Sequence, residues 1–298
     1  MRGSQGRFAR VLTAMVTPFN TAGQVDLNRA VDLARWLLAH GSDALVVNGT
    51  TGESPTTTPE EKLALVSAIS DAVGSERVMA GAGGNFTDEV IELAVRSESA
   101  GASALLCAAG YYNKPSQEGL YRHFRAVAES VTCPVYLYNV PGRTIVNIEA
   151  STTARLATDV PNIVGTKEAS ANLVQIGEIL RLTPDDFDVY SGDDGTILPL
   201  LALGGAGVIS VVSHIIGPDI QAVHEAWFDG RQDEAARLFL KTLPITKALF
   251  SAPSPAPVKF ALSLLGQEVG GLRLPMTELT DSEKDVVAAA LRAYDIGA

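Results

Sequence analysis

Asn162-Ile163-Val164-Gly165-Thr166-Lys167-Glu168 is a short apolar run that follows Pro161 and contains a lysine near its end. Its length and its β-branched residues predict a buried strand rather than a helix. Strict alternation places Lys167 on the same face as Ile163 and Gly165, so Gly165 is expected to leave space beside an inward-pointing amine. A strand-end lysine that reaches water is the ordinary interpretation. The alternative is a desolvated amine that acts as a nucleophile toward carbonyl compounds.

Around this stretch, short apolar runs alternate with amphipathic segments, which is typical of a parallel sheet built from βα units. Amphipathic patterns predict helices over residues 27–40, 60–72, 87–100, 117–130 and 173–182. The expected strands are residues 11–17, 44–48, 78–82, 104–108, 135–139, 163–167, 188–191 and 207–211. Eight such runs in one chain favour an α/β fold of the closed (β/α)8 TIM-barrel type.

The alternative architecture is an open doubly wound sheet. Its glycine-rich fingerprint is broken here, because Phe86 stands where the last glycine should be. After residue 211 the pattern becomes helical, over residues 218–229, 232–250, 258–265 and 282–295. We therefore expect a barrel over residues 1–215, with residues 216–298 supplying C-terminal helices that complete it and form a helical subdomain. Thr58, which opens a Thr-Pro-Glu-Glu sequence, is expected to cap a helix.

Composition narrows the functional classes. The chain has 298 residues, 46% of them hydrophobic, and a formal net charge of −11. Such a charge argues against nucleic-acid and anionic-membrane partners, because phosphate contacts require clustered Lys and Arg. The start of the chain carries no pattern of an export signal or a membrane span, so a cytoplasmic location is expected. Residues 1–4 resemble an expression-vector leader.

Polar residues follow most of the predicted strands. In a barrel of this class, chemistry takes place in the loops at the carboxyl ends of the strands. Lysine condenses with ketones, tyrosine relays protons, and arginine binds carboxylates with two hydrogen bonds, so together they would supply carbonyl chemistry. The residues expected on this rim are Thr50, Thr51, Tyr111, Tyr112, Tyr138, Arg143, Lys167, Asp193, Asp194, Ile209 and His214.

Each of these side chains also has a structural interpretation. Thr50 and Thr51 could be turn residues whose hydroxyls bond nearby backbone, and the tyrosines could be packing residues. For Asp193 and Asp194 we favour capping of the following helix. The conjunction of residue types on one rim is what favours chemistry.

Other chemistries have weaker support. A metal site needs several converging ligands, and of the four histidines only His214 is predicted on the rim, so no metal is expected. A phosphate site after the seventh and eighth strands would meet the repulsion of Asp193 and Asp194. A Ser-His-Asp hydrolase would need a Gly-x-Ser-x-Gly elbow that this sequence lacks.

Five motifs occur together in a known order and spacing. They are residues 49–53 (Gly-Thr-Thr-Gly-Glu), 111–115 (Tyr-Tyr-Asn-Lys-Pro), 138–144 (Tyr-Asn-Val-Pro-Gly-Arg-Thr), 165–168 (Gly-Thr-Lys-Glu) and 207–210 (Gly-Val-Ile-Ser). The chain thereby resembles the dihydrodipicolinate synthase and N-acetylneuraminate lyase family over nearly its whole length. The resemblance implies a (β/α)8 barrel with a C-terminal helical extension, and a homotetramer built as a dimer of dimers. Arg143 points to the synthase branch, which uses pyruvate and L-aspartate 4-semialdehyde in lysine and diaminopimelate biosynthesis.

The resemblance also implies roles for individual residues. Lys167 would form a Schiff base with pyruvate, and Tyr138, Thr51 and Tyr112 would relay protons, with Tyr112 reaching into the neighbouring subunit's site. Thr50 and Thr51 would receive the pyruvate carboxylate, Arg143 would hold the semialdehyde carboxylate, and the Ile209 carbonyl would lie beside the nascent centre. No cofactor is implied. Two alternatives stay open: another class I pyruvate-dependent aldolase or lyase acting on a sugar acid or 2-keto acid, and a non-enzymatic sensor.

One family property concerns regulation. Asn85, Glu89 and Tyr111 match the site at which lysine inhibits some members. Pro59 and Lys62, however, stand where strongly inhibited members tend to carry histidine or glutamate. A cation at Lys62 predicts weak feedback inhibition, because it repels a cationic effector.

Overall fold

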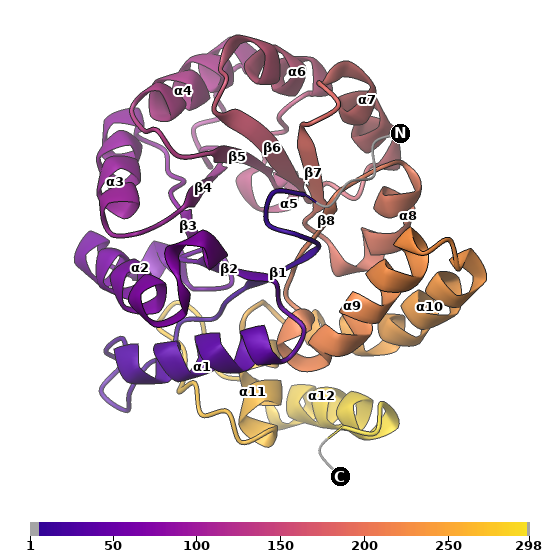
Figure 1. Ribbon diagram of the computed structural model, residues 1–298. Helices are drawn as coiled ribbons and strands as arrows, with labels where there is room; N and C mark the ends of the chain where they lie inside the picture. The colour runs from indigo at the N-terminus through magenta and orange to yellow at the C-terminus, as the bar shows by residue number, and fades with distance from the viewer. Residues whose placement is uncertain (1–5, 297–298) are drawn as a thin grey trace.

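The computed structural model describes residues 6–296, so the leader-like residues 1–4 lie outside it. Within that range eight parallel strands pair in chain order and close into a barrel, with β1 joining β8 through the register pair Val11↔Val208. Figure 1 looks into this barrel, with the helices arranged around it. The strands are β1 Val11–Ala14, β2 Ala44–Val47, β3 Val78–Gly81, β4 Ala104–Ala108, β5 Val135–Asn139, β6 Ile163–Glu168, β7 Asp188–Ser191 and β8 Gly207–Ser210. The predicted TIM barrel is confirmed, and the open sheet is excluded.

Helices connect the strands on the outside of the barrel, as each amphipathic segment packs its apolar face on the sheet. The connecting helices are α1 Leu27–Ala39, α2 Pro59–Val73, α3 Thr87–Ser99, α4 Gln117–Glu129, α5 Pro141–Thr144, α6 Ala150–Asp159, α7 Leu173–Leu182 and α8 Ile197–Ala202. Short 3-10 turns add η1 Ser54–Thr56, η2 Ser75–Arg77 and η3 Asp194–Thr196. Thr58 caps α2 in a reciprocal capping box with Glu61, as predicted.

Three of these helices were not expected from the sequence. α5 has one turn and α8 has six residues, which is too short for a periodic pattern to show. α6 is longer, but its sequence Ala-Ser-Thr-Thr-Ala-Arg-Leu-Ala-Thr-Asp is rich in threonine and begins without a side-chain cap. Packing against α4 and α7 stabilises it instead.

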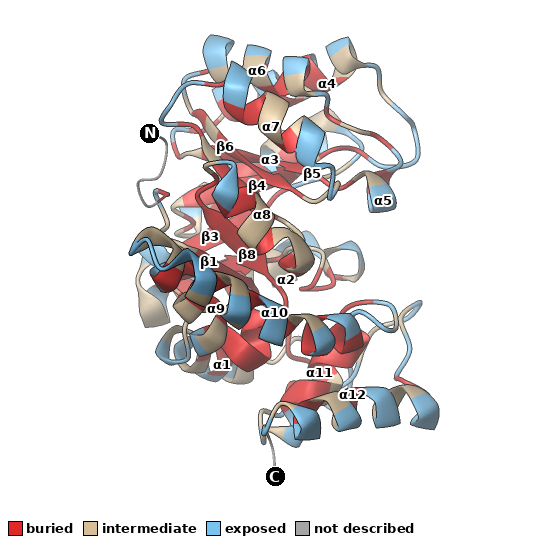
Figure 2. Ribbon diagram, turned by 90° about the vertical axis from the view of Figure 1, so that its right-hand side faces the viewer, coloured by how far each residue is buried: buried red, intermediate tan, exposed pale blue. Residues whose placement is uncertain are grey.

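Two apolar layers form the core, one on each side of the barrel wall. The inner layer fills the barrel with large side chains such as Met79, Tyr136 and Tyr190, so the interior is packed rather than open. The outer layer lies between the strands and the helices. In Figure 2 the strands are mostly red, while the helices carry pale blue on their outward faces. Such a wall holds the strand ends, and the side chains on them, in fixed positions.

A β-bulge in β6 changes the expected alternation. Val135 pairs with Ile163, but Tyr136 pairs with Gly165, so one extra residue is inserted at Val164. Ile163 therefore belongs to the outer layer, whereas Val164 packs on the inner layer. The prediction that Ile163 shares a face with Lys167 is wrong, because strict alternation does not continue through a bulge.

The C-terminal helices α9 Ser213–Phe228, α10 Gln232–Leu249, α11 Ala256–Leu264 and α12 Asp281–Ala293 follow the last strand. α9 packs on β1, β8 and α1, so it completes the ring, while α11 and α12 pack together beyond it (Figure 1). The backbone of α9 is non-helical at Ile216, two residues before Pro218. The predicted boundary at residues 215 and 216 falls at this kink, and the division into two domains stays a prediction. In the described part of the chain, no helix has the length and apolar character to cross a membrane.

Candidate active site

Lys167 and Tyr138 lie side by side at the carboxyl end of the barrel. They are register partners on β6 and β5, and the Lys167 Nζ atom lies 4.5 Å from the centroid of the Tyr138 ring. Lys167 is only 5% exposed and Tyr138 7%, so the lysine does not extend into water. The ordinary interpretation of Lys167 is thereby excluded. A buried primary amine beside a phenol is a pair that can attack a carbonyl and move a proton.

The space around Lys167 comes from a different glycine than expected. A Cβ atom on Gly192 would lie 3.0 Å from Lys167 Cε and 2.6 Å from the Cβ of Ala169. A Cβ atom on Gly165 would instead lie 2.5 Å from Tyr136 Cε1 and 2.7 Å from the Asp188 carbonyl oxygen. The prediction that Gly165 makes room for the amine is therefore wrong. Gly165 accommodates the Tyr136 ring inside the barrel, and Gly192, at the end of β7, accommodates Lys167.

Thr50 and Thr51 lie in a tight turn over residues 49–54, which follows β2 on the same rim. The amides of Gly52 and Ser54 both donate to the Gly49 carbonyl, at 3.0 and 3.4 Å. Thr51 is 6% exposed, whereas Thr50 is partly exposed. Ile209, the predicted backbone contributor, is buried in β8 opposite Leu12. The turn and Ile209 thus lie at the carboxyl ends of β2 and β8, and their roles in binding stay a prediction.

Tyr112 is not packed beside Lys167 within its own chain. Its side chain is 88% exposed, and its backbone has a φ of 71°, a conformation that is uncommon for a residue other than glycine. The loop is fixed next to it, because the Tyr111 amide donates to Asn85 Oδ1 at 2.7 Å. An exposed, conformationally constrained tyrosine suits a contact with another molecule better than a contact within the chain.

Arg143 is exposed on the one-turn helix α5, and a buried polar cluster supports the segment that carries it. Glu168, directly after Lys167, accepts hydrogen bonds from Asn139 Nδ2 at 3.0 Å and from Gln175 Nε2 at 3.0 Å. Asn139 Nδ2 also donates to Asn147 Oδ1 at 2.9 Å. The cluster connects β5, β6 and α7 to the segment after α5.

Sequence reasoning did not assign this supporting role. The available signal was Glu168 itself, a carboxylate inside an apolar strand, which needs donors when it is buried. The identity of those donors depends on the tertiary fold.

Asp193 and Asp194 differ, although both were expected to cap a helix. Asp193 does cap η3, accepting from the Gly195 amide at 2.7 Å. Asp194 is instead buried and accepts from Ser210 Oγ and from the Val211 amide at 3.0 Å, so it joins β7 to the end of β8. Burial raises the pKa of Asp194. Its carboxylate occupies backbone amides that a phosphate group would need, which argues against a phosphate-binding barrel.

His214 is buried under the rim with both ring nitrogens engaged. Its Nε2 accepts from the Val16 amide at 3.1 Å, and its Nδ1 lies 2.8 Å from the Val211 carbonyl oxygen. Burial lowers the pKa of His214 to about 4, so the ring is neutral at pH 7. Across residues 6–296 no group of three or more His, Cys, Asp or Glu side chains could hold a metal ion. The structure thus places His214 in a supporting role.

Comparison with known proteins identifies the family of this chain. The profile of the dihydrodipicolinate synthetase family matches residues 7–294. This chain belongs to the dihydrodipicolinate synthetase family. Members named 4-hydroxy-tetrahydrodipicolinate synthase share its sequence over most of their length. The Bacillus subtilis protein is 50% identical over 278 residues, covering 93% of this chain and 96% of that protein. The Moorella thermoacetica protein is 50% identical over 287 residues, covering 96% and 98%.

A solved structure of the same family has the same fold. The enzyme from Cyanidioschyzon merolae, crystallised with lysine bound, superimposes with a TM-score of 0.96 at 46% identity. The match covers 98% of this chain and 100% of that one. The family resemblance drawn from five motifs is therefore confirmed.

Proposed function

We propose that this chain is a 4-hydroxy-tetrahydrodipicolinate synthase, which condenses pyruvate with L-aspartate 4-semialdehyde. The observation that carries the proposal is Lys167, a buried amine against the Tyr138 ring at the mouth of the barrel. Relatives at 50% identity that bear this enzyme name support it. Arg143, exposed on the one-turn helix α5, supplies a cation for the carboxylate of the semialdehyde.

The reaction begins when the neutral Lys167 amine adds to the keto carbon of pyruvate and water leaves. The resulting iminium draws electrons from the neighbouring methyl group, which loses a proton to give an enamine. The enamine carbon then forms a bond with the aldehyde carbon of the semialdehyde, and the aldehyde oxygen takes up a proton. Finally the amine of the semialdehyde attacks the iminium carbon, closing the ring and releasing Lys167.

Protons and carboxylates need their own partners in this scheme. Tyr138, beside Lys167, is placed to move the first protons, and Thr51 joins it from the turn after β2. Thr50 and Thr51 receive the pyruvate carboxylate through the hydroxyl and backbone groups of that turn. Arg143 binds the semialdehyde carboxylate with its guanidinium fork, and the Ile209 carbonyl faces the forming centre.

Tyr112 completes the relay only in an assembly of subunits. Because its side chain is 88% exposed in its own chain, we assign it to the site of a neighbouring chain. The proposed assembly is a homotetramer made of two such dimers. We place the enzyme in the cytoplasm, where lysine and diaminopimelate biosynthesis takes place.

Turnover of pyruvate with a panel of aldehydes tests this function. We expect aspartate semialdehyde to react about 10- to 150-fold faster, in kcat/KM, than aldehydes without a carboxylate, because a missing charged partner costs about 1.5–3 kcal/mol. The rate is measured from the absorbance of the product, or from a coupled assay in which a second enzyme reduces the product. Faster cleavage of a sugar acid than condensation with the semialdehyde would instead identify another pyruvate-dependent lyase.

Weak feedback by lysine is a second expectation. A cavity of about 340 Å³ is lined by Asn85, Glu89 and Tyr111, which match the family's lysine site, and by Lys62, which departs from it. Burial lowers the pKa of Lys62, yet any charge it carries repels a cationic effector. Lys62→Glu should therefore strengthen lysine inhibition about tenfold, a gain of about 1.4 kcal/mol. Steady-state inhibition constants measure this effect.

The control for Lys62→Glu is Lys247→Glu, which makes the same change of charge at an exposed position on α10. Its inhibition constant should equal that of the unchanged enzyme. Potent inhibition of the unchanged enzyme would contradict the expectation.

A further inference from the structure

A buried ion pair links the C-terminal helices to the turn that carries Thr50 and Thr51. Lys259, on α11, places its Nζ atom 2.7 Å from Glu53 Oε1, and the side chains are 4% and 2% exposed. The ammonium also donates to the Gly271 carbonyl at 2.7 Å and lies 4.4 Å from the centroid of the Phe19 ring. The ammonium thus has a carboxylate, a backbone carbonyl and a ring face around it, and these contacts restrict its position.

Glu53 is the residue on which these contacts converge. Its second oxygen, Oε2, accepts from the Arg273 amide at 3.1 Å. Its backbone is left-handed, with φ 55° and ψ 36°, a conformation rare for glutamate. Such a backbone persists only where its surroundings impose it, and it is commonest at functional sites. Here the imposed conformation falls two residues after Thr51.

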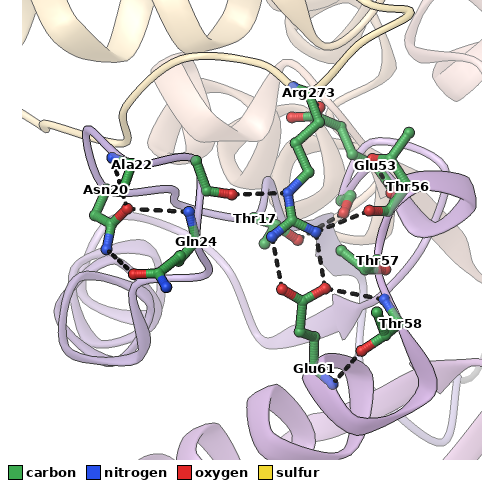
Figure 3. A network of polar contacts seen from close by, with 12 residues as sticks. Thr17, Asn20, Ala22, Gln24, Glu53, Thr56, Thr57, Thr58, Glu61 and Arg273 are labelled. Atoms are coloured by element: carbon green, nitrogen blue, oxygen red, sulfur yellow. Dashed lines mark hydrogen bonds and ion pairs between the residues drawn. The ribbon is translucent and has the colours of Figure 1, made fainter.

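The Arg273 side chain ties together the segment that follows this turn, as Figure 3 shows. Its guanidinium binds both oxygens of Glu61, at 2.6 and 2.7 Å, and donates to the Thr56 carbonyl at 2.8 Å. On the opposite side, Thr17 Oγ1 donates to the Gly52 carbonyl at 2.6 Å. The turn over residues 49–54 is therefore held by Thr17, which follows β1, and at Glu53 by the Lys259 ammonium and the Arg273 backbone amide.

Stability alone is a poor reason for such an arrangement. Desolvation of two charges offsets most of their attraction, so apolar residues of equal volume stabilise a fold as well or better. Burial indeed lowers the pKa of Lys259, although Glu53 raises it. The pair instead provides conformational specificity, because it fixes one geometry of the Glu53 side chain and hence of the turn.

We infer that Lys259 is a positioning residue for catalysis: through Glu53 it holds the 49–54 turn so that Thr50 and Thr51 face the Lys167 site. The inference rests on the proposed function, in which these threonines receive the pyruvate carboxylate and relay its proton. The C-terminal subdomain is then part of the catalytic apparatus, although its helices carry none of the reacting groups.

The test is a double variant, Glu53→Gln with Lys259→Met, which removes both charges and leaves neither unpaired. We expect kcat to fall at least about tenfold and the pyruvate concentration for half-maximal borohydride trapping to rise at least about fivefold, because a misplaced turn affects both steps. The KM for the semialdehyde should stay unchanged, because a separate polar cluster supports the segment that carries Arg143. Circular dichroism checks the fold, and Glu53→Gln alone serves as the milder variant if the double variant does not fold.

Lys284→Met is the matched control, because Lys284 on α12 forms a solvent-exposed pair with Asp281 at 3.7 Å. It should leave kcat and trapping unchanged. A folded double variant with the unchanged enzyme's kcat and trapping would overturn the inference. So would a fall in kcat with unaltered trapping, since partial unfolding gives that result. Failure of the proposed function is distinct, because the unchanged enzyme itself would then not consume the semialdehyde.

Discussion

Lys167→Met is expected to abolish covalent capture of pyruvate. The variant keeps an unbranched side chain of similar volume but lacks the amine, so no Schiff base forms and borohydride reduces nothing onto the protein. Turnover should fall by at least about 10⁴-fold, equivalent to about 5.4 kcal/mol of transition-state stabilisation. Intact mass measured after borohydride treatment reports the adduct, and a continuous assay reports turnover.

The control for this substitution is Lys247→Met, which removes an exposed lysine of α10 and should trap pyruvate normally. Peptide mapping of the unchanged enzyme should place the adduct on Lys167. An adduct on another lysine, or trapping by Lys167→Met, would refute the assignment of the nucleophile.

Arg143→Ala is expected to separate the two halves of the reaction. Removal of the guanidinium should lower kcat/KM for the semialdehyde at least about 100-fold, about 2.7 kcal/mol, since a charge-assisted bidentate contact is lost. Capture of pyruvate should be unaffected, because Lys167 and Tyr138 are untouched. Steady-state kinetics with each substrate varied, alongside borohydride trapping, measure the two effects.

Arg143→Lys should give an intermediate rate, because it keeps the charge and loses the planar fork. Arg122→Ala is the matched control, as Arg122 lies on the exposed face of α4 and pairs with Glu118. Unchanged condensation by Arg143→Ala would favour the rival lyase, which does not need a carboxylate partner at this position.

Much of the barrel was predictable because its signals are local. Parallel strands buried on both faces appear as short apolar runs, and the helices between them have a regular apolar face. The bounds of β4, β5 and β7 agree with the sequence pattern at both ends, and β1 differs only in ending at Ala14 rather than at residue 17. Helices α5 and α8 were missed because they are too short for a periodic pattern, and α6 was missed because packing against neighbouring helices stabilises it more than its own sequence does.

The residues of the site likewise fall into those that local sequence could identify and those that depend on the tertiary fold. Lys167 could be identified because a lysine in an apolar strand is unusual in the sequence itself. Gly192 could not, because the close approach of its backbone to Lys167 depends on how β6 and β7 pair. Asp194 was expected to cap a helix because aspartate before a helix is a common cap. In the fold its carboxylate accepts instead from the amides that follow β8.

The sequence by itself determined the alternation of strands and helices, the lysine among apolar residues, and the motifs that carry the family resemblance. These follow from periodicity and residue type, which are properties of neighbouring residues. Only the tertiary structure decided the bulge in β6, the burial of Lys167 against Tyr138, and the contact of Lys259 with Glu53. Those features arise when segments far apart in the chain exclude water together, and desolvation and close packing are set by the whole fold.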